Sequence, residues 1–394
     1  MVDPKSKIDY YTAVTALAKL YRAGVPASSI TPALVGPTAQ YWTNILQPLP
    51  AATATNPAPS YAAPGFCGAN PTTDRLVAAY NLFSCFQNNE TTAVQYLDQG
   101  LGLTDPTSGA SYYANGGPYT FVDPQFASLY AWRSLGTAAY NALQVTLRRQ
   151  MSHGLQFDFN YTYSKSIDIS SDANRITDEG GLGGQVINPW RPNALRSVSD
   201  FDLTHQINAN WIWELPFGSG RWIGKDSHGV VNALIGGWQL AGLARWTSGF
   251  PIGVFNGQQW PTNWELSGYA TKTGPVTTHG AVKNPDGSVN LFGDVSAAAT
   301  AFGAFSPDFP GQVGNRNNLR GGGFAGLDAG LSKRWKISEG KSLQFRWEVF
   351  NVLNLTRFDV QSLSLLLTNS SSFGNYTGLL TNPRSMQFML RFEF

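Results

Sequence analysis

Four acidic residues stand close together in the chain and could bind a hard cation. Asp168, Asp172, Asp178 and Glu179 fall within one stretch that we expect to be a loop. Carboxylate oxygens are the ligands that calcium prefers. Their spacing does not follow an EF-hand loop, which favours solvated acidic side chains over a calcium site. No cofactor is expected, and calcium remains a weak hypothesis for this loop.

Three aromatic residues in a later segment could bind a flat ligand. Trp260, Trp264 and Tyr269 are close enough in sequence to stack on a sugar ring. The favoured alternative is an aromatic loop that packs on itself.

Signals for catalysis are sparse. The histidines His153, His205, His228 and His279 are widely separated and lack metal-ligand spacing. The runs Gly181–Gly184 and Gly321–Gly323 are not framed by the strand and helix that a phosphate-binding loop needs. A polysaccharide-active enzyme would need a convergent pair of carboxylates, and none is identifiable. We therefore expect that the protein is not an enzyme.

The two cysteines, Cys67 and Cys85, lie close together in a polar, proline-rich region. A disulfide between them would suit an oxidising compartment. Two independent thiols are the alternative, because sequence alone cannot establish the geometry that a disulfide requires.

The composition favours a sheet protein with many aromatic residues over an ordinary soluble enzyme. Charged residues make up 13% of the chain, against about 25% in a typical soluble protein. The net charge of +2 is dispersed, so no nucleic-acid partner is expected. No apolar run is long enough for a membrane helix. The first residues lack the apolar core of a secretion signal, so we expect either a removed signal or the tail of a longer polypeptide.

Residues 1–124 predict a loop-rich, partly helical region. Tyr10, Val14, Leu17 and Tyr21 recur at helical spacing. Asp74 is a suitable N-cap for a second helix. A third helix is expected over residues 93–99, and residues 48–64 should be irregular.

From Tyr140 onward the period of the apolar residues changes from 3.6 to 2, which indicates strands that expose one apolar face. Seven strands are predicted, and residues 125–132 could form an eighth. The apolar positions of the first six are Leu143, Val145, Leu147; Leu155, Phe157, Phe159, Tyr161, Tyr163; Leu203, Ile207, Ala209, Trp211, Trp213; Trp238, Leu240, Trp246; Leu327, Ala329, Leu331, Trp335; and Leu343, Phe345, Trp347, Val349.

The seventh strand ends the chain. Its apolar face carries the residues Met386, Phe388, Leu390, Phe392 and Phe394. An alternating aromatic strand of this kind is typical of an outer-membrane barrel, although a soluble sheet can also look like this.

The connectors also follow the pattern of outer-membrane barrels. They are short after residues 150 and 337, but long over residues 167–195, 250–324 and 354–384, as expected for periplasmic turns and outer loops. This pattern places residues 1–124 outside the cell. The opposite face of the strands would line a polar lumen with Gln144, Asp158, Asn160, Asn208, Arg334, Arg346 and Glu348. The predicted fold is therefore an antiparallel transmembrane β-barrel segment over residues 125–394.

Residues 125–394 resemble the C-terminal barrel portion of TonB-dependent outer-membrane receptors, especially the Oar-like branch. The segments that carry the resemblance are YNALQVTL (140–147), YTYSKSID (161–168), SDFDLTH (199–205), WELPFG (213–218), GGWQL (236–240), FNVLN (350–354) and NPRSMQF (382–388). The resemblance implies a barrel of about 22 strands around a plug, in the outer membrane of a Gram-negative bacterium.

The chain departs from that family because no plug and no TonB-contact segment can be identified in it. We therefore expect a C-terminal fragment that supplies barrel wall and ligand-capturing loops and that is not transport-competent alone. Its implied partners are outer-membrane lipid, the missing N-terminal strands and plug, and the barrel assembly machinery, which would recognise the final strand. TonB would be a partner only through the absent plug. The alternative is a secreted or surface-exposed β-sheet binding protein that acts in carbohydrate binding or adhesion.

Overall fold

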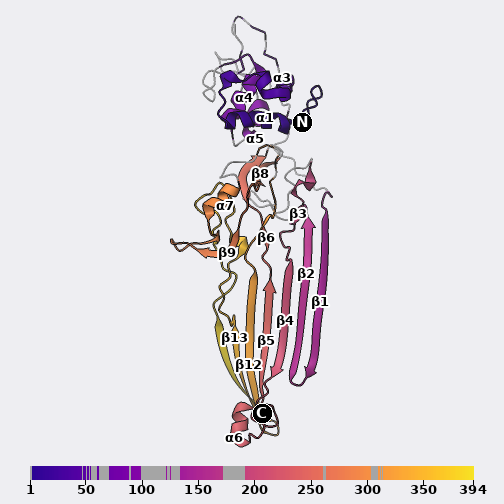
Figure 1. Cartoon of the computed structure of the whole chain (residues 1–394), viewed down its shortest axis with the longest axis vertical. Helices are drawn as coiled ribbons and strands as arrows, with labels where there is room; N and C mark the ends of the chain where they lie inside the picture. Colours follow the sequence, from indigo (N-terminus) through magenta and orange to yellow (C-terminus); the bar gives the residue numbers. More distant parts are fainter. Residues whose placement is uncertain are drawn as a thin grey trace.

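The structure is a computed structural model that describes residues 2–46, 48–49, 51–52, 54, 60–61, 71–87, 90–98, 121, 125, 134–171, 191–260, 263–302, 309–310, 312 and 314–394. These residues form three parts along the long axis of the molecule (Figure 1). A helical group occupies one end, small sheets and loops lie in the middle, and a long sheet extends to the other end, near the C-terminus.

The helical group begins with the predicted first helix, α1 (Tyr10–Arg22), which the structure confirms. The Asp9 carboxylate caps this helix by accepting a hydrogen bond from the Thr12 amide at 3.1 Å. Asp74 likewise caps α4 (Arg75–Cys85), as predicted. The third predicted helix is present as α5 (Glu90–Asp98), and α2 (Pro32–Val35) and α3 (Ala39–Ile45) complete the group.

An aromatic core joins these helices. Trp42 of α3 and Phe83 of α4 are fully buried, with ring centroids 5.1 Å apart. The buried carboxylate of Glu90 is paired, because it accepts hydrogen bonds from the Tyr21 hydroxyl at 2.5 Å and from Arg22 at 2.8 Å. The described part of residues 1–124 is thus a packed helical unit. Most of the predicted irregular segment lies outside the described residues.

The long sheet contains the seven predicted strands in chain order. They are β1 (Ala138–Ser152), β2 (Leu155–Asp168), β4 (His205–Glu214), β5 (Trp238–Thr247), β12 (Phe324–Ser338), β13 (Lys341–Phe350) and β14 (Ser385–Glu393), with the short β3 (Ser197–Val198) beside β2. Every neighbouring pair is antiparallel. Among the described residues the sheet is not closed, and β1 and β14 are its edges. Of the possible eighth strand, only Gln125 lies within the described residues.

The register of the ladders places like side chains in rows across the sheet. Trp213, Leu240, Leu331, Trp347 and Phe388 occupy one such row. The rings of Trp347 and Phe388 stack with centroids 5.8 Å apart. Because neighbouring residues of a strand point to opposite faces, this register keeps the apolar side chains of all strands on one face.

One position in the sheet requires glycine. The indole ring of Trp211 lies over Gly242 on the neighbouring strand, and a Cβ on Gly242 would lie 2.1 Å from a ring carbon. This contact accounts for the glycine in the middle of β5.

The segment predicted as a long loop over residues 250–324 is instead folded. It contains β6 (Pro251–Ile252), β7 (Phe255–Trp260), β8 (Asn263–Tyr269), β9 (Thr278–Lys283), β10 (Val289–Phe292), α7 (Val295–Ala301) and β11 (Leu319–Arg320). These short elements pack with residues of the 354–384 connector around a second core. In that core Phe292 and Phe373 stack with centroids 5.3 Å apart. Burial in this core, rather than regular alternation along a strand, stabilises the segment.

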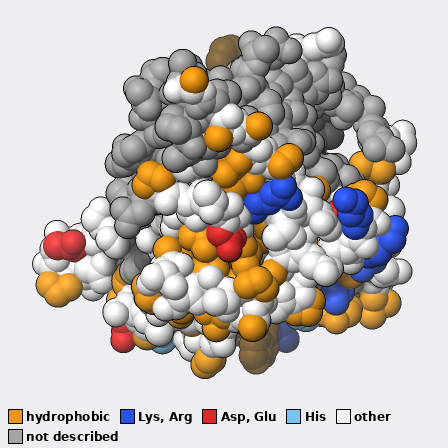
Figure 2. Space-filling model, turned by 90° about the horizontal axis from the view of Figure 1, so that it is seen from above, with side chains coloured by type: hydrophobic (Ala, Val, Ile, Leu, Met, Phe, Trp, Pro, Cys, Tyr) orange, Lys and Arg blue, Asp and Glu red, His pale blue; other side chains and the backbone are white. Residues whose placement is uncertain are grey.

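The helical group contacts this middle part. The guanidinium of Arg22 lies 4.7 Å from the centroid of the Phe309 ring, and the Thr15 hydroxyl donates a hydrogen bond to the Pro310 carbonyl at 3.3 Å. Viewed from the helical end, the described surface carries scattered basic groups and few acidic ones among uncharged side chains (Figure 2).

At the opposite end of the sheet, the connector between β4 and β5 contains a short helix, α6 (Gly229–Ile235). None of the helices in the described ranges has the length and apolar character needed to cross a membrane.

Candidate functional site

The apolar face of the long sheet is exposed over much of its area. Phe388 and Leu390 on β14 are 68% and 67% exposed, and Leu143, Val145 and Leu147 on β1 are also exposed. Contiguous apolar surfaces of this kind are rare on soluble monomers and mark membrane or partner contacts. The alternation along each strand therefore defines a face suited to lipid.

The other face is polar and internally paired. Arg148 and Asp158 form an ion pair at 2.5 Å across β1 and β2, and Thr146 donates to Asn160 at 2.9 Å. On β13, Arg346 and Glu348 pair at 2.5 Å. The ladder registers place on this face all the residues predicted to line a lumen: Gln144, Asp158, Asn160, Asn208, Arg334, Arg346 and Glu348.

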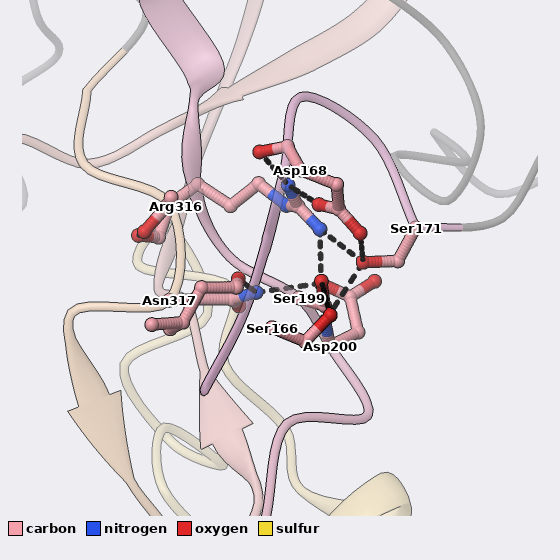
Figure 3. Close-up of polar contacts among 9 residues, drawn as sticks. Ser166, Asp168, Ser171, Ser199, Asp200, Arg316 and Asn317 are labelled. Atoms are coloured by element: carbon pink, nitrogen blue, oxygen red, sulfur yellow. Dashed lines mark hydrogen bonds and ion pairs between the residues drawn. The ribbon is translucent and has the colours of Figure 1, made fainter. Parts of the chain in front are cut away.

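A buried polar cluster fixes the end of the sheet that lies nearer the helical group (Figure 3). Its centre is Arg316, which precedes β11. The guanidinium donates to Asp168 Oδ1 and to Asp200 Oδ1, both at 2.7 Å, and also to the Ser171 hydroxyl. The Ser171 hydroxyl in turn donates to Asp168 at 2.8 Å. Arg316, which precedes β11, thus joins the end of β2 to the segment that follows β3.

The residue after Arg316 strengthens this junction. Asn317 has a left-handed backbone (φ 53°), which directs its side chain amide to the Val198 carbonyl at 2.8 Å and to Asp200 at 2.6 Å. The Ser197 hydroxyl donates to the Arg316 carbonyl at 2.7 Å. Both the backbone and the side chain of residues 316–317 are therefore bound to the β3 segment.

A second arginine forms a similar junction a few residues later in the chain. Arg320 pairs with Asp202 and donates to the carbonyls of Asp202 and Gly249, each at 3.0 Å. Asp202 in turn accepts the Ser166 amide at 2.6 Å. The two arginines hold the segment before β12 against the end of β2 and the segment before β4.

The electrostatics of the first junction keep its groups in fixed protonation states. Burial alone would lower the pKa of Arg316, but the carboxylates of Asp200 and Asp168 raise it above the usual value. Burial raises the pKa of the nearby Tyr269 hydroxyl, and the negative charge of Asp200 raises it further. Arg316 is therefore a permanent cation and Tyr269 a neutral phenol at physiological pH.

A cavity of about 370 Å³ opens beside this cluster. It is lined by Ala194, Leu195, Arg196, Ser197, Lys272, Gly314, Asn315, Arg316 and Asn318. The two cations Arg196 and Lys272 form no ion pair within the described part of the chain. The side-chain nitrogen and oxygen of Asn318 are both buried and have no hydrogen-bond partner among the described residues. These groups could bind a small ligand that carries negative charge and hydrogen-bonding oxygens.

The structure places two of the weak candidate site residues in contacts within the protein. Asp168 is bound to Arg316 and Ser171, so its carboxylate is not presented to a cation. Tyr269 is 4% exposed and packs on Phe255, which is the packing role that the sequence favoured over stacking on a ligand. Asp172, Asp178 and Glu179 lie outside the described residues. Among the described residues, no group of three His, Cys, Asp or Glu side chains could hold a metal ion.

Other predicted site residues remain predictions. Trp260 and Trp264 belong to the backbone ladder of β7 and β8, and their side chains are outside the described set. Cys85 ends α4, whereas Cys67 lies outside the described residues, so their pairing remains a prediction. The assembly role of Met386, Phe388, Leu390 and Phe392 of β14, and of Phe394 after it, is likewise still a prediction.

Sequence reasoning missed the Arg316 cluster and the cavity. The only local signal is the polar run Gly314-Asn315-Arg316-Asn317-Asn318, which holds a cation and three amides before β11. The partners of Arg316 lie more than a hundred residues away in sequence, and no periodicity relates them to it.

Comparison with known protein families agrees with the geometry of the sheet. The model of a family described as an outer membrane beta barrel domain matches residues 78–387. The chain belongs to this family and is an outer-membrane barrel protein. This membership favours the membrane interpretation of the exposed apolar face over the secreted alternative. No curated protein and no solved structure matches the chain.

Proposed function

We propose that the chain supplies the C-terminal part of the wall of a TonB-dependent receptor of the Oar-like branch. The receptor would lie in the outer membrane of a Gram-negative bacterium and would have no enzymatic activity. In this proposal the apolar face meets lipid and the polar face lines the lumen. The end that holds the Arg316 cluster is outside the cell, where it captures the ligand. The family membership and the segments that resemble such receptors support this assignment.

The direction of the two edge strands is the observation that carries the proposal. Six successive antiparallel pairings relate β1 to β14, so these two edges run in the same direction. Single-chain bacterial barrels are antiparallel throughout and contain an even number of strands. Direct pairing of β14 with β1 would give a parallel seam. An odd number of further strands is therefore needed, which supports a larger barrel.

The cavity at the loop end supports the receptor part of the proposal. Arg196, Lys272 and the amide of Asn318, which has no partner in the described part of the chain, offer donors to a ligand with carboxylate, phosphate or sulfate groups. Receptor sites of this type bind through a few placed polar groups on a rigid frame. Here the frame is the pair of arginine junctions. In the full receptor, a plug would close the lumen and would make the contact with TonB.

The test is to isolate the protein from outer membranes of its own cells under conditions that keep the sheet folded. Photo-crosslinking amino acids are placed at Leu143 on β1 and at Leu390 on β14, and the products are identified by mass spectrometry. We expect crosslinks to strands outside residues 125–394, and a plug domain in the same assembly. A crosslink that joins β1 directly to β14 would refute the larger barrel. An assembly without a plug would refute the assignment to a TonB-dependent receptor.

A further inference from the structure

The connector between β4 and β5 is a compact unit at the end of the sheet opposite the Arg316 cluster. Asn232 on α6 accepts a hydrogen bond from the Ser219 amide at 2.7 Å. Gly218 and Gly236 meet beside it, and a Cβ on Gly218 would lie 2.6 Å from the Cα of Gly236. This close packing fixes the position of α6 relative to the rest of the connector.

Side chains from two strands bind the C-terminal carbonyls of α6. The Ala233 carbonyl accepts hydrogen bonds from Lys333 Nζ at 2.6 Å and from Trp335 Nε1 at 2.7 Å. The Leu234 carbonyl accepts from Trp238 Nε1 at 2.8 Å and from Lys333 Nζ at 3.2 Å. The last carbonyls of a helix lack partners within it, and a cation at this end is stabilising. The helix is therefore bound firmly to the sheet.

The residues that hold α6 belong to the apolar face. Lys333 pairs in register with Trp238 on one side and with Phe345 on the other, and Phe345 pairs with Leu390. A lysine on a lipid-facing surface is costly unless its charge is satisfied. Here Lys333 is 5% exposed and lies over the rings of Trp238 and Trp335, at 5.4 and 5.2 Å. Both hydrogen-bond acceptors of the Lys333 ammonium group are carbonyls of α6.

The outer surface of the connector is apolar although nothing within the described chain covers it. Trp222 is 87% exposed, Val230 76%, Leu234 64% and Val231 56%. Two exposed basic residues, Arg221 and Lys225, border these side chains. The connector thus combines exposed valine, leucine and tryptophan with flanking cations, a composition suited to the boundary between acyl chains and phosphate headgroups.

Continuity with the lipid-facing sheet identifies what covers this surface. The tethers of α6 lie in the same rows as the exposed residues of β14, so the apolar surface of the connector extends the face that the family places in the membrane. We propose that α6, together with Trp222, is an interfacial anchor that inserts into the phospholipid leaflet at the turn end of the barrel. The anchor would fix the depth of the wall in the bilayer, independently of any ligand.

The test uses the protein extracted with its partner strands and reconstituted into phosphatidylcholine vesicles. A fluorescent amino acid replaces Val231 in one sample and Asp226, an exposed polar position of the same connector, in the control. Lipids brominated near the headgroup end of the acyl chains should quench the probe at 231 and blue-shift its emission. The probe at 226 should keep its fluorescence and should be quenched by aqueous iodide.

Three results would overturn the anchor. The first is a probe at 231 that iodide quenches and bromine does not, which would place the helix in water. The second is protection of that probe from both quenchers, which would indicate a protein partner. The third is energy transfer between probes on two copies, which would indicate contact between copies of the chain. The double variant Trp222→Gln, Leu234→Gln should lose the bromine quenching while the wall stays folded, as judged by heat-modifiable mobility.

Discussion

Arg316 and Asp168 are 148 residues apart in the sequence, yet their side chains form an ion pair at 2.7 Å and are only 3% and 6% exposed. This contact binds the segment before β11 to the end of β2. It is the reason that the cavity has a rigid wall.

Replacement of Arg316 by methionine should destabilise the loop end by about 3–5 kcal/mol, because it leaves the buried Asp168 carboxylate without its partner. Hydrogen exchange of residues 197–200 and 314–318 measures this effect. The matched control is Arg148→Met, which removes an arginine that is 71% exposed and should cost about 0–1 kcal/mol. Equal effects of the two variants would contradict a structural role of the buried pair.

The double variant Arg196→Gln, Lys272→Gln should weaken the binding of citrate or inorganic phosphate to the reconstituted protein. Each lost hydrogen bond to a charged group is worth about 1.5–3 kcal/mol. Isothermal titration calorimetry measures the change. Lys283→Gln is the control, since it removes an exposed cation on β9 that does not line the cavity. If the wild-type protein binds neither anion, or if Lys283→Gln has the same effect, the cavity is not an anion site.

The Arg316 cluster should open at alkaline pH. The pKa of Tyr269 is raised in the folded protein, so its contribution to stability is complete below the unfolded value of about 10 and is lost as the pH rises above it. Subtilisin cleavage between residues 309 and 320 reports the opening. Tyr269→Phe has no ionisable hydroxyl, so its cleavage should rise less steeply with pH. Identical pH profiles of the two proteins would assign the opening to other groups.

Phe394→Asp, or deletion of Phe394, should impair assembly into the outer membrane. The Phe394 side chain is 95% exposed at the end of the edge strand β14, where the assembly machinery can reach it. The yield of heat-modifiable protein in outer-membrane fractions measures assembly. Phe201→Asp changes another exposed phenylalanine, at the opposite end of the sheet, and should assemble normally. Normal assembly of the Phe394 variants would refute the role of Phe394 as an assembly signal.

Replacement of α6 by a short turn should lower the free energy of unfolding more when Lys333 is present than in a Lys333→Met background. Without the helix, the lysine would meet lipid uncovered, at a cost near the interface of about 1 kcal/mol. Urea unfolding in vesicles of the four proteins, with and without α6 and with lysine or methionine at 333, gives the coupling energy. A purely additive result would mean that α6 does not satisfy the lysine.

The sequence was sufficient to predict the strands of the long sheet but not the elements at its ends. Strands such as β13 carry their period-2 pattern within their own residues, and the caps Asp9 and Asp74 act over only three residues. The short strands β6 and β11 have two residues each, too few for a pattern. The covered Lys333 and the Arg316 cluster depend on contacts between distant segments, which become visible only after folding.

The shared direction of β1 and β14 also has a consequence for symmetry. If identical copies of this sheet were arranged in a ring around an axis along the barrel, rotation would preserve the direction of every strand. Each junction between β14 of one copy and β1 of the next would then be parallel, whatever the number of copies. No cyclic homo-oligomer of this sheet can therefore form an antiparallel barrel. The strands that complete the wall must have a sequence different from the seven described here.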